Sequence, residues 1–152
     1  MAFFEGINMT AGYGNGPDII SSCSIKVNRG EIVAILGPNG AGKSTAMKAM
    51  LGLLSLKSGS VSIDGSDISK FSPHDRIKKG ISFVPQTRNV FTELTVRENL
   101  EVGAFLREND INKVIDEIYE LFPILKEKNS QIVGQLSGGQ RQQVALGRAL
   151  MI

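Results

Sequence analysis

Apolar residues in the first part of the chain follow the pattern of β-strands separated by turns. Strands are predicted at residues 3–10, 19–27 and 81–84, and residues 61–65 read as a strand that enters a tight turn. Residues 31–36 (Glu-Ile-Val-Ala-Ile-Leu) are apolar without alternation. Such a run is typical of a strand buried on both faces of a parallel sheet.

Helical periodicity takes over in the second part of the chain. A first helix is predicted early, at about residues 44–54, and a second at about residues 110–122, where apolar residues form one stripe that ends before Pro123. Residues 95–98 (Thr-Val-Arg-Glu) have the form of a capping box, and so does Ser-Gly-Gly-Gln from Ser137. The chain therefore predicts a β-rich part followed by a helical part.

Composition narrows the class of protein. At 152 residues the chain has the length of one domain, and 41% hydrophobic with 21% charged residues is ordinary for a globular protein. A net charge of +2 gives no basic surface for nucleic acid. The single cysteine, Cys23, excludes an internal disulfide and is expected to be a small buried residue. No apolar run approaches the ~20 residues of a membrane-spanning helix, and the N-terminus lacks the order of a secretory signal.

A glycine-rich loop directly follows the apolar run at 31–36 and precedes the first predicted helix. It fits the pattern G-x-x-x-x-G-K-[ST] and consists of Gly37, Pro38, Asn39, Gly40, Ala41, Gly42, Lys43, Ser44 and Thr45. Its glycines let backbone N–H groups turn inward around phosphates. The positive end of the next helix faces the same anion, Lys43 adds a full charge, and the Ser44 hydroxyl can ligate Mg²⁺. The strand–loop–helix order predicts a triphosphate site.

A second glycine-containing motif occurs downstream, formed by Leu136, Ser137, Gly138, Gly139 and Gln140. A serine hydroxyl and glycine N–H groups at a helix N-terminus can also bind an anion. A plain helix cap would be the better interpretation of an isolated Ser-Gly-Gly. Here the motif stands within the longer run Leu-Ser-Gly-Gly-Gln-Arg-Gln-Gln-Val-Ala-Leu-Gly-Arg-Ala-Leu.

The glycine loop, then Pro85-Gln86, then Leu-Ser-Gly-Gly-Gln, in that order, resemble the nucleotide-binding subunit of ABC transporters. Residues 83–100, 118–123 and 147–151 look most like the ATPase subunits of branched-chain amino-acid importers. That branch often has Glu where this chain has Gln86. The resemblance covers essentially the whole chain.

The resemblance implies an α/β fold: a P-loop NTPase core with a mostly parallel sheet and flanking helices, an antiparallel β subdomain and a helical subdomain. Residues 1–152 would form a partial ABC ATPase domain. Within it, residues 1–85 would be the nucleotide-binding part, residues 86–136 the Gln86 loop and helical subdomain, and residues 137–152 the signature helix.

The same resemblance assigns roles to individual residues. Tyr13 would stack on the adenine of ATP, although a turn aromatic after Gly12 is the alternative. Residues 37–45 would hold the phosphates and Mg²⁺, and Gln86 would contact the metal with an amide that can donate and accept hydrogen bonds. Ser137, Gly138 and Gly139, with Leu136 and Gln140, would cap the γ-phosphate of ATP held by the opposite chain.

Partners are also implied. Two such subunits, identical or paralogous, would close on shared ATP, and residues 88–91 (Arg88 to Phe91) would contact a transmembrane permease. Val90 and Phe91 would otherwise form an unexplained apolar patch, unless they are simply buried. The protein would be peripheral, at the cytoplasmic face of a prokaryotic inner membrane, and no nucleic acid is expected. ATP hydrolysis would be coupled to solute import.

The resemblance implies general-base catalysis of hydrolysis, by a Glu beside a metal-binding Asp and with a His later in the chain. None is assigned in this chain, because Asp64 is expected in a hairpin turn and His74 on the surface. The sequence looks like an N-terminal fragment that ends before the Walker B strand, so we expect ATP binding without efficient hydrolysis and an unpaired, exposed edge beside residues 31–36. A nucleotide-binding module without turnover, and the ATPase of another ABC system (exporter or soluble), remain alternatives. A GTPase and a small-molecule kinase are disfavoured.

Overall fold

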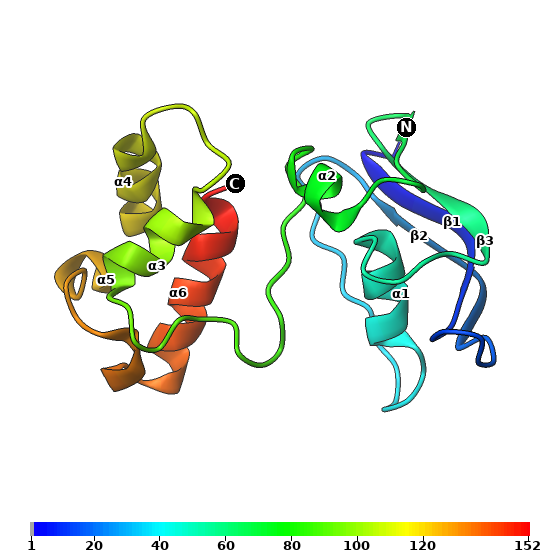
Figure 1. Cartoon of the computed structure of the whole chain (residues 1–152), viewed down its shortest axis with the longest axis horizontal. Helices are drawn as coiled ribbons and strands as arrows, with labels where there is room; N and C mark the ends of the chain where they lie inside the picture. Colours follow the sequence, from blue (N-terminus) through cyan, green and yellow to red (C-terminus); the bar gives the residue numbers. More distant parts are fainter. Residues whose placement is uncertain (1) are drawn as a thin grey trace. The chain divides into compact units, whose positions relative to one another are not determined.

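The structure, a computed structural model, describes residues 2–152, which divide into two compact units at the boundary between Lys79 and Gly80 (Figure 1). The first unit contains an antiparallel sheet and two helices, and the second consists of an irregular segment followed by helices. Within the described residues, no helix is both long enough and apolar enough to span a bilayer.

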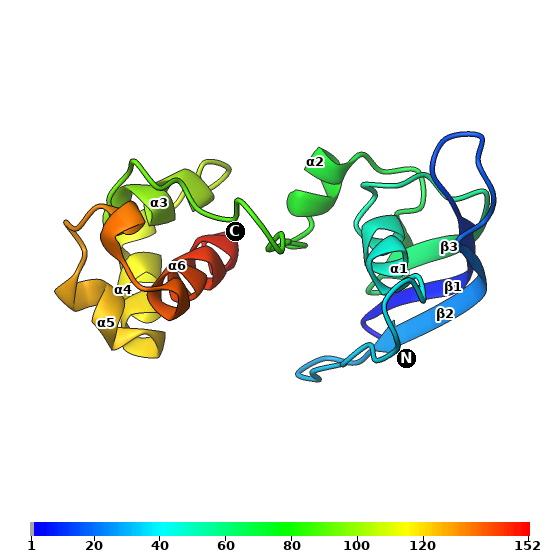
Figure 2. The same ribbon diagram turned by 90° about the horizontal axis from the view of Figure 1, so that it is seen from below.

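The sheet of the first unit has four antiparallel strands in the order β2-β1-β3-β4. Their bounds are Phe4–Ala11 (β1), Ile20–Val27 (β2), Ser58–Ile63 (β3) and Ser66–Asp67 (β4). Helix α1, Lys43–Met50, lies against β1 and β2 (Figure 1, Figure 2). The strands predicted at 3–10, 19–27 and 61–65, with its tight turn, are confirmed.

Alternating positions of the sheet supply the buried apolar residues that face α1. Met9, Ala11 and Val61 are fully buried, as is Ala49 of α1. Cys23 is expected from the sequence to be buried, but the structure shows it half-buried. Because burial of apolar side chains is the main favourable term in folding, this small contact holds α1 against the sheet.

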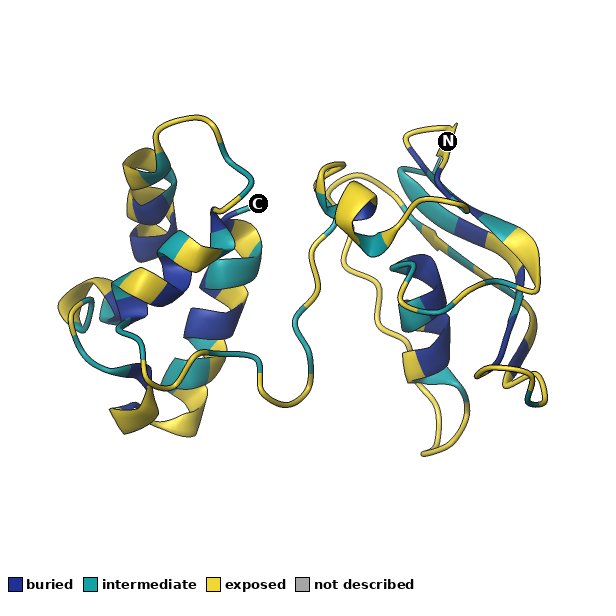
Figure 3. Cartoon of the chain, viewed as in Figure 1, coloured by how far each residue is buried: buried dark blue, intermediate teal, exposed yellow. Residues whose placement is uncertain are grey.

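Two predicted strands are absent. Residues 31–36 and 81–84 are irregular backbone, so the prediction of strands there is wrong. A strand is stable only when a neighbour pairs with its N–H and C=O groups, and no described segment pairs with either. The expected exposure of residues 31–36 is confirmed, since Ile32 is 97% and Leu36 is 90% exposed. The connection between β2 and α1 is accordingly yellow in Figure 3.

A buried arginine secures the C-terminal end of α1. Arg76, in helix α2 (Pro73–Ile77), is 2% exposed and donates hydrogen bonds to the carbonyl oxygens of Met50 at 2.6 Å and Ser69 at 3.0 Å. Burial lowers the pKa of Arg76. The guanidinium satisfies a carbonyl of the kind that helix ends leave without a partner. His74 of the same helix is exposed, as expected.

The second unit contains four α-helices and one turn of 3-10 helix. They are α3 (Val96–Gly103), α4 (Ile111–Leu121), α5 (Pro123–Glu127), η1 (Val133–Gln135) and α6 (Gly138–Leu150). Their buried residues, dark blue in Figure 3, form one core that includes Leu100, Ile115, Leu125 and Val144.

The local signals for these helices are confirmed. Asp110 caps α4, and Pro123 occupies the first position of α5 directly after α4 ends. Both predicted capping boxes are present, one between Thr95 and Glu98 and one between Ser137 and Gln140. The hydrogen bonds of the first lower the pKa of Glu98.

Candidate nucleotide-binding site

The glycine loop at residues 37–42 leads directly into α1. Gly40 and Gly42 adopt left-handed backbone conformations, with φ of 84° and 92°. A Cβ on Gly42 would also lie 2.9 Å from Cγ2 of Ile20 in β2. Both the backbone conformation and the contact with the sheet require glycine at position 42.

Lys43 reaches back across this loop. Its Nζ donates hydrogen bonds to the carbonyl oxygens of Gly37 at 2.6 Å and Pro38 at 2.8 Å. The loop itself is closed by a hydrogen bond from the Ala41 N–H to the carbonyl of Pro38 at 3.2 Å. The ammonium group is therefore held beside backbone turned by glycines, where an anionic ligand would replace its carbonyl partners.

The N-terminal end of α1 presents free donors. Gly42 is its N-cap and offers no side-chain oxygen to the first N–H groups, and the first turn contains no acidic residue. The helix dipole places partial positive charge at this end, which favours an anion. Ser44 is exposed there, whereas Thr45 is buried. The loop, Lys43 and the helix end together can cradle a polyphosphate.

Tyr13 lies in the connection between β1 and β2 and contacts the same helix. Lys48 of α1 donates a hydrogen bond from Nζ to the Tyr13 hydroxyl at 3.2 Å, and the ammonium lies 5.4 Å from the ring centroid. Hydrogen bonds from Lys48 and then Thr45 lower the pKa of Tyr13. The side chain is 48% exposed, so its ring is accessible for stacking. The first unit thus brings Tyr13 and residues 37–45 together.

The second motif forms the N-terminal end of α6 in the other unit. The Ser137 hydroxyl accepts a hydrogen bond from the Gln140 N–H at 3.3 Å, and Oε1 of Gln140 accepts from the Ser137 N–H at 3.1 Å. Leu136 is buried and anchors the motif to the helical core. Among residues 2–152, a Cβ on Gly138 or Gly139 would meet no atom within 4 Å beyond the nearby backbone of α6 itself. Packing against the described residues therefore does not explain these two glycines.

Replacing Ser137 by Ala should destabilise the helical unit by about 1 kcal/mol, because the N-terminal end of α6 loses its side-chain cap. Urea unfolding followed by circular dichroism measures the change. Ser130→Ala is the matched control, since Ser130 is exposed and outside the helices. Equal stabilities of the two variants would contradict the capping role.

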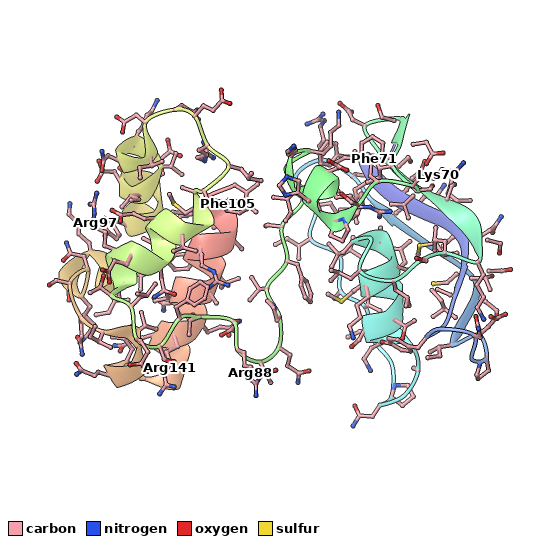
Figure 4. The ribbon with its side chains drawn as sticks, in the orientation of Figure 1. Lys70, Phe71, Arg88, Arg97, Phe105 and Arg141 are labelled. Carbon is pink, nitrogen blue, oxygen red and sulfur yellow. The ribbon has the colours of Figure 1, made fainter. Side chains whose placement is uncertain are left out.

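Gln86 and residues 88–91 belong to the irregular segment before α3. Gln86 is exposed. Arg88, which is labelled in Figure 4, adopts a left-handed backbone conformation with a φ of 52°. Val90 packs against the helical core, so burial is the correct alternative for that residue. Phe91 remains 48% exposed, with the guanidinium of Arg148 4.9 Å from its ring centroid.

A fully buried amide fixes this segment. Oδ1 of Asn99 in α3 accepts a hydrogen bond from the Phe91 N–H at 2.9 Å, and Nδ2 donates to the carbonyls of Phe91 and Thr95, each at 2.9 Å. Asn89 also donates from Nδ2 to Oε1 of Gln142 in α6 at 3.1 Å. Residues 89–91 are thereby attached to α3 and α6.

Sequence reasoning missed Lys48 and Asn99. Neither has a local signal: lysine is common on helix surfaces, and an asparagine within a helix gives no indication that its amide will be enclosed. Among the described residues, no cluster of three or more His, Cys, Asp or Glu side chains could hold a metal ion.

The sequence is similar to those of known proteins. The family described as ABC transporter matches residues 20–152. The chain is 43% identical over 129 residues to the high-affinity branched-chain amino acid transport ATP-binding protein BraG of Pseudomonas aeruginosa, covering 84% of this chain and 55% of BraG. It is 41% identical to the lipopolysaccharide export system ATP-binding protein LptB of Haemophilus influenzae, covering 87% of this chain and 56% of LptB.

Solved structures give the same result. A nucleotide-free ATP-binding cassette from an ABC transporter is 31% identical with a TM-score of 0.82, covering 99% of this chain and 65% of that chain. The ADP conformation of an ATP-binding cassette is 29% identical with the same score and coverage. The chain thus spans less than two thirds of these relatives. The expected fold class is confirmed; among residues 2–152 its paired strands are the antiparallel ones.

Proposed function

The chain belongs to the ABC transporter family, and on that premise we propose that it is the ATP-binding part of a subunit that couples ATP to solute transport. The observation that carries the proposal is the loop at residues 37–42, with Lys43 held beside it and the uncapped N-terminal end of α1 next to it. Four phosphate charges require many donors in a small space, and this arrangement supplies them.

Within this site, residues 37–45 bind the phosphates and Tyr13 stacks on the adenine. The accessible ring of Tyr13, beside the same helix, supports that role. Mg²⁺ fits the exposed hydroxyl of Ser44 in the first turn of α1. When bound, the metal neutralises phosphate charge; Lys43 and the helix end orient the phosphates.

The motif at residues 136–140 acts on nucleotide held by a second ATP-binding subunit. Its support is the N-terminal end of α6, where the exposed residues Gly138 and Gly139 leave room for an approaching phosphate. Residues 88–91 contact the transmembrane permease, and the half-exposed ring of Phe91 supports this assignment. These contacts hold the protein at the cytoplasmic face of the inner membrane. A structural neighbour from Clostridium perfringens is itself part of an ABC transporter complex.

Import of branched-chain amino acids is the leading transport function. BraG, and the probable branched-chain amino acid transport ATP-binding protein LivF of Archaeoglobus fulgidus at 38% identity, support it. The likeness to LptB supports export as the second candidate. Leucine uptake by cells in which the gene that encodes this chain replaces the gene of an importer's own ATP-binding subunit separates them, because an export ATPase will not restore uptake.

Nucleotide binding by the chain tests the proposed site directly. We expect Mg-ATP to displace a fluorescent ATP analogue at least tenfold better than AMP does, since charge-assisted contacts to the outer phosphates contribute ~1.5–3 kcal/mol each. Equal affinities for ATP and AMP would rule out a phosphate site at residues 37–45. Phosphate release in the same samples measures whether bound ATP is turned over, which we expect to be slow.

A further inference from the structure

The connection between β1 and β2, residues 12–19, is an ordered loop and carries Tyr13. The Gly16 N–H donates a hydrogen bond to the Tyr13 carbonyl at 3.0 Å, and the Ile19 N–H donates to the Ala11 carbonyl at 2.9 Å. A Cβ on Gly12 would lie 2.2 Å from the carbonyl oxygen of Pro17. The backbone of the loop is therefore folded tightly onto itself.

A lysine distant in sequence attaches this loop to the sheet. Lys57, directly before β3, donates from Nζ to the Gly16 carbonyl at 2.7 Å and to Oδ1 of Asp18 at 2.8 Å. Its own N–H donates to the carbonyl of Thr10 at 2.8 Å, at the end of β1. Both sides of the loop that contains Tyr13 are thus connected to one residue.

The ion pair between Lys57 and Asp18 is expected to contribute little to the free energy of folding. The side chains of Lys57 and Asp18 are 39% and 42% exposed, and exposed pairs of this kind contribute little to folding. The hydrogen bond from Lys57 to the Gly16 carbonyl instead fixes the turn that starts at Tyr13. Lys48 of α1 contacts the hydroxyl group of the Tyr13 side chain. The ring is held through its backbone by one lysine and at its hydroxyl by another.

We propose that Lys57 is a positioning residue for the base of the nucleotide: it holds the Tyr13 loop in the conformation that stacks on adenine. The inference rests on the proposed function and adds to it a residue that does not touch the ligand. A loop that is already ordered loses less conformational freedom when the base binds, so the affinity for the base portion of ATP rises. Contacts to the phosphates do not depend on this loop.

A double-mutant cycle with Tyr13 tests the proposal. We expect Lys57→Met to weaken Mg-ATP binding about threefold to tenfold, the range that corresponds to ordering a few interface groups. In a Tyr13→Ala background the same substitution should have no further effect, because no ring remains to be positioned. Asp18→Asn should reproduce the effect in the same direction and more weakly. Binding of magnesium tripolyphosphate, which has no base, should be unchanged in all variants.

Lys26→Met is the matched control, since it removes the same charge from a side chain that is 66% exposed. The Nζ of Lys26 lies 3.9 Å from Oε2 of Glu5, which is a long and weak contact. Additive effects of Lys57→Met and Tyr13→Ala, or an equal loss of tripolyphosphate binding, would overturn the positioning role and leave the nucleotide site intact. Failure of the unaltered chain to bind either ATP or tripolyphosphate would overturn the proposed function itself, and the inference with it.

Discussion

Replacing Lys43 by Ala will weaken Mg-ATP binding roughly tenfold to a hundredfold, because the outer phosphates lose a charge-assisted hydrogen bond of ~1.5–3 kcal/mol. The structure supplies the reason for a large effect: Nζ lies beside the loop, 2.6 Å from the Gly37 carbonyl oxygen, where it can exchange its carbonyl partners for phosphate oxygens. Little side-chain ordering remains to oppose binding. Titration with a fluorescent ATP analogue measures the loss.

Two comparisons make the result specific to the phosphates. Lys70→Ala removes the same charge from an exposed side chain that has no role in the site (Figure 4), and it should leave ATP affinity within about twofold, as is usual for exposed charges. AMP, which lacks the outer phosphates, should bind the Lys43→Ala variant and the unaltered chain alike. A similar loss with Lys70→Ala would assign the effect to net charge.

Replacing Asn99 by Ala will lower the free energy of unfolding of the helical unit by about 1–3 kcal/mol, because it leaves the Phe91 N–H without a partner and removes one of the two donors to the Phe91 carbonyl, the other being the Leu94 N–H at 3.3 Å. The Asn99 side chain itself is fully buried, so its removal also leaves unfilled space between α3 and the backbone of residues 89–91. Urea unfolding followed by far-ultraviolet circular dichroism measures the change. The tryptic cleavage rate at Arg88 should rise as well, since residues 89–91 lose their attachment to α3.

Asn109→Ala provides the matched control for this substitution. Asn109 is exposed between α3 and α4 and forms no side-chain hydrogen bond in the described chain, so its loss should change stability by less than about 0.5 kcal/mol. If Asn99→Ala were no more destabilising than Asn109→Ala, the segment at residues 89–91 would be held by Val90 and Phe91 packing and not by the amide.

Local patterns predicted much of the helical unit. The apolar stripe of α4 and the two capping boxes involve residues three or four positions apart, and a helix satisfies its hydrogen bonds within one segment. Neighbours in sequence are therefore neighbours in space, and the spacing is sufficient. The hairpin at Asp64 was predictable for the same reason, since its partners are adjacent in the chain.

At residues 31–36, by contrast, the local pattern predicted a strand that the structure does not form. Their composition is that of a buried strand, yet all the backbone hydrogen bonds of a sheet join a strand to neighbouring segments that the strand itself does not contain. Without a paired neighbour the backbone stays irregular and Ile32 stays exposed. Composition indicates that a segment can form a strand; pairing decides whether it does.

The sequence by itself determined the glycine loop that we propose binds phosphate, because its glycines, Lys43 and Ser44 are contiguous, and the backbone conformation and the helix end follow directly from their order. Only the tertiary structure decided which side chains surround that loop. Lys48 meets Tyr13, Lys57 meets Gly16, and Asn99 encloses the backbone of Phe91. These contacts arise when separate elements pack together, and no spacing along the chain encodes which donor will face which acceptor.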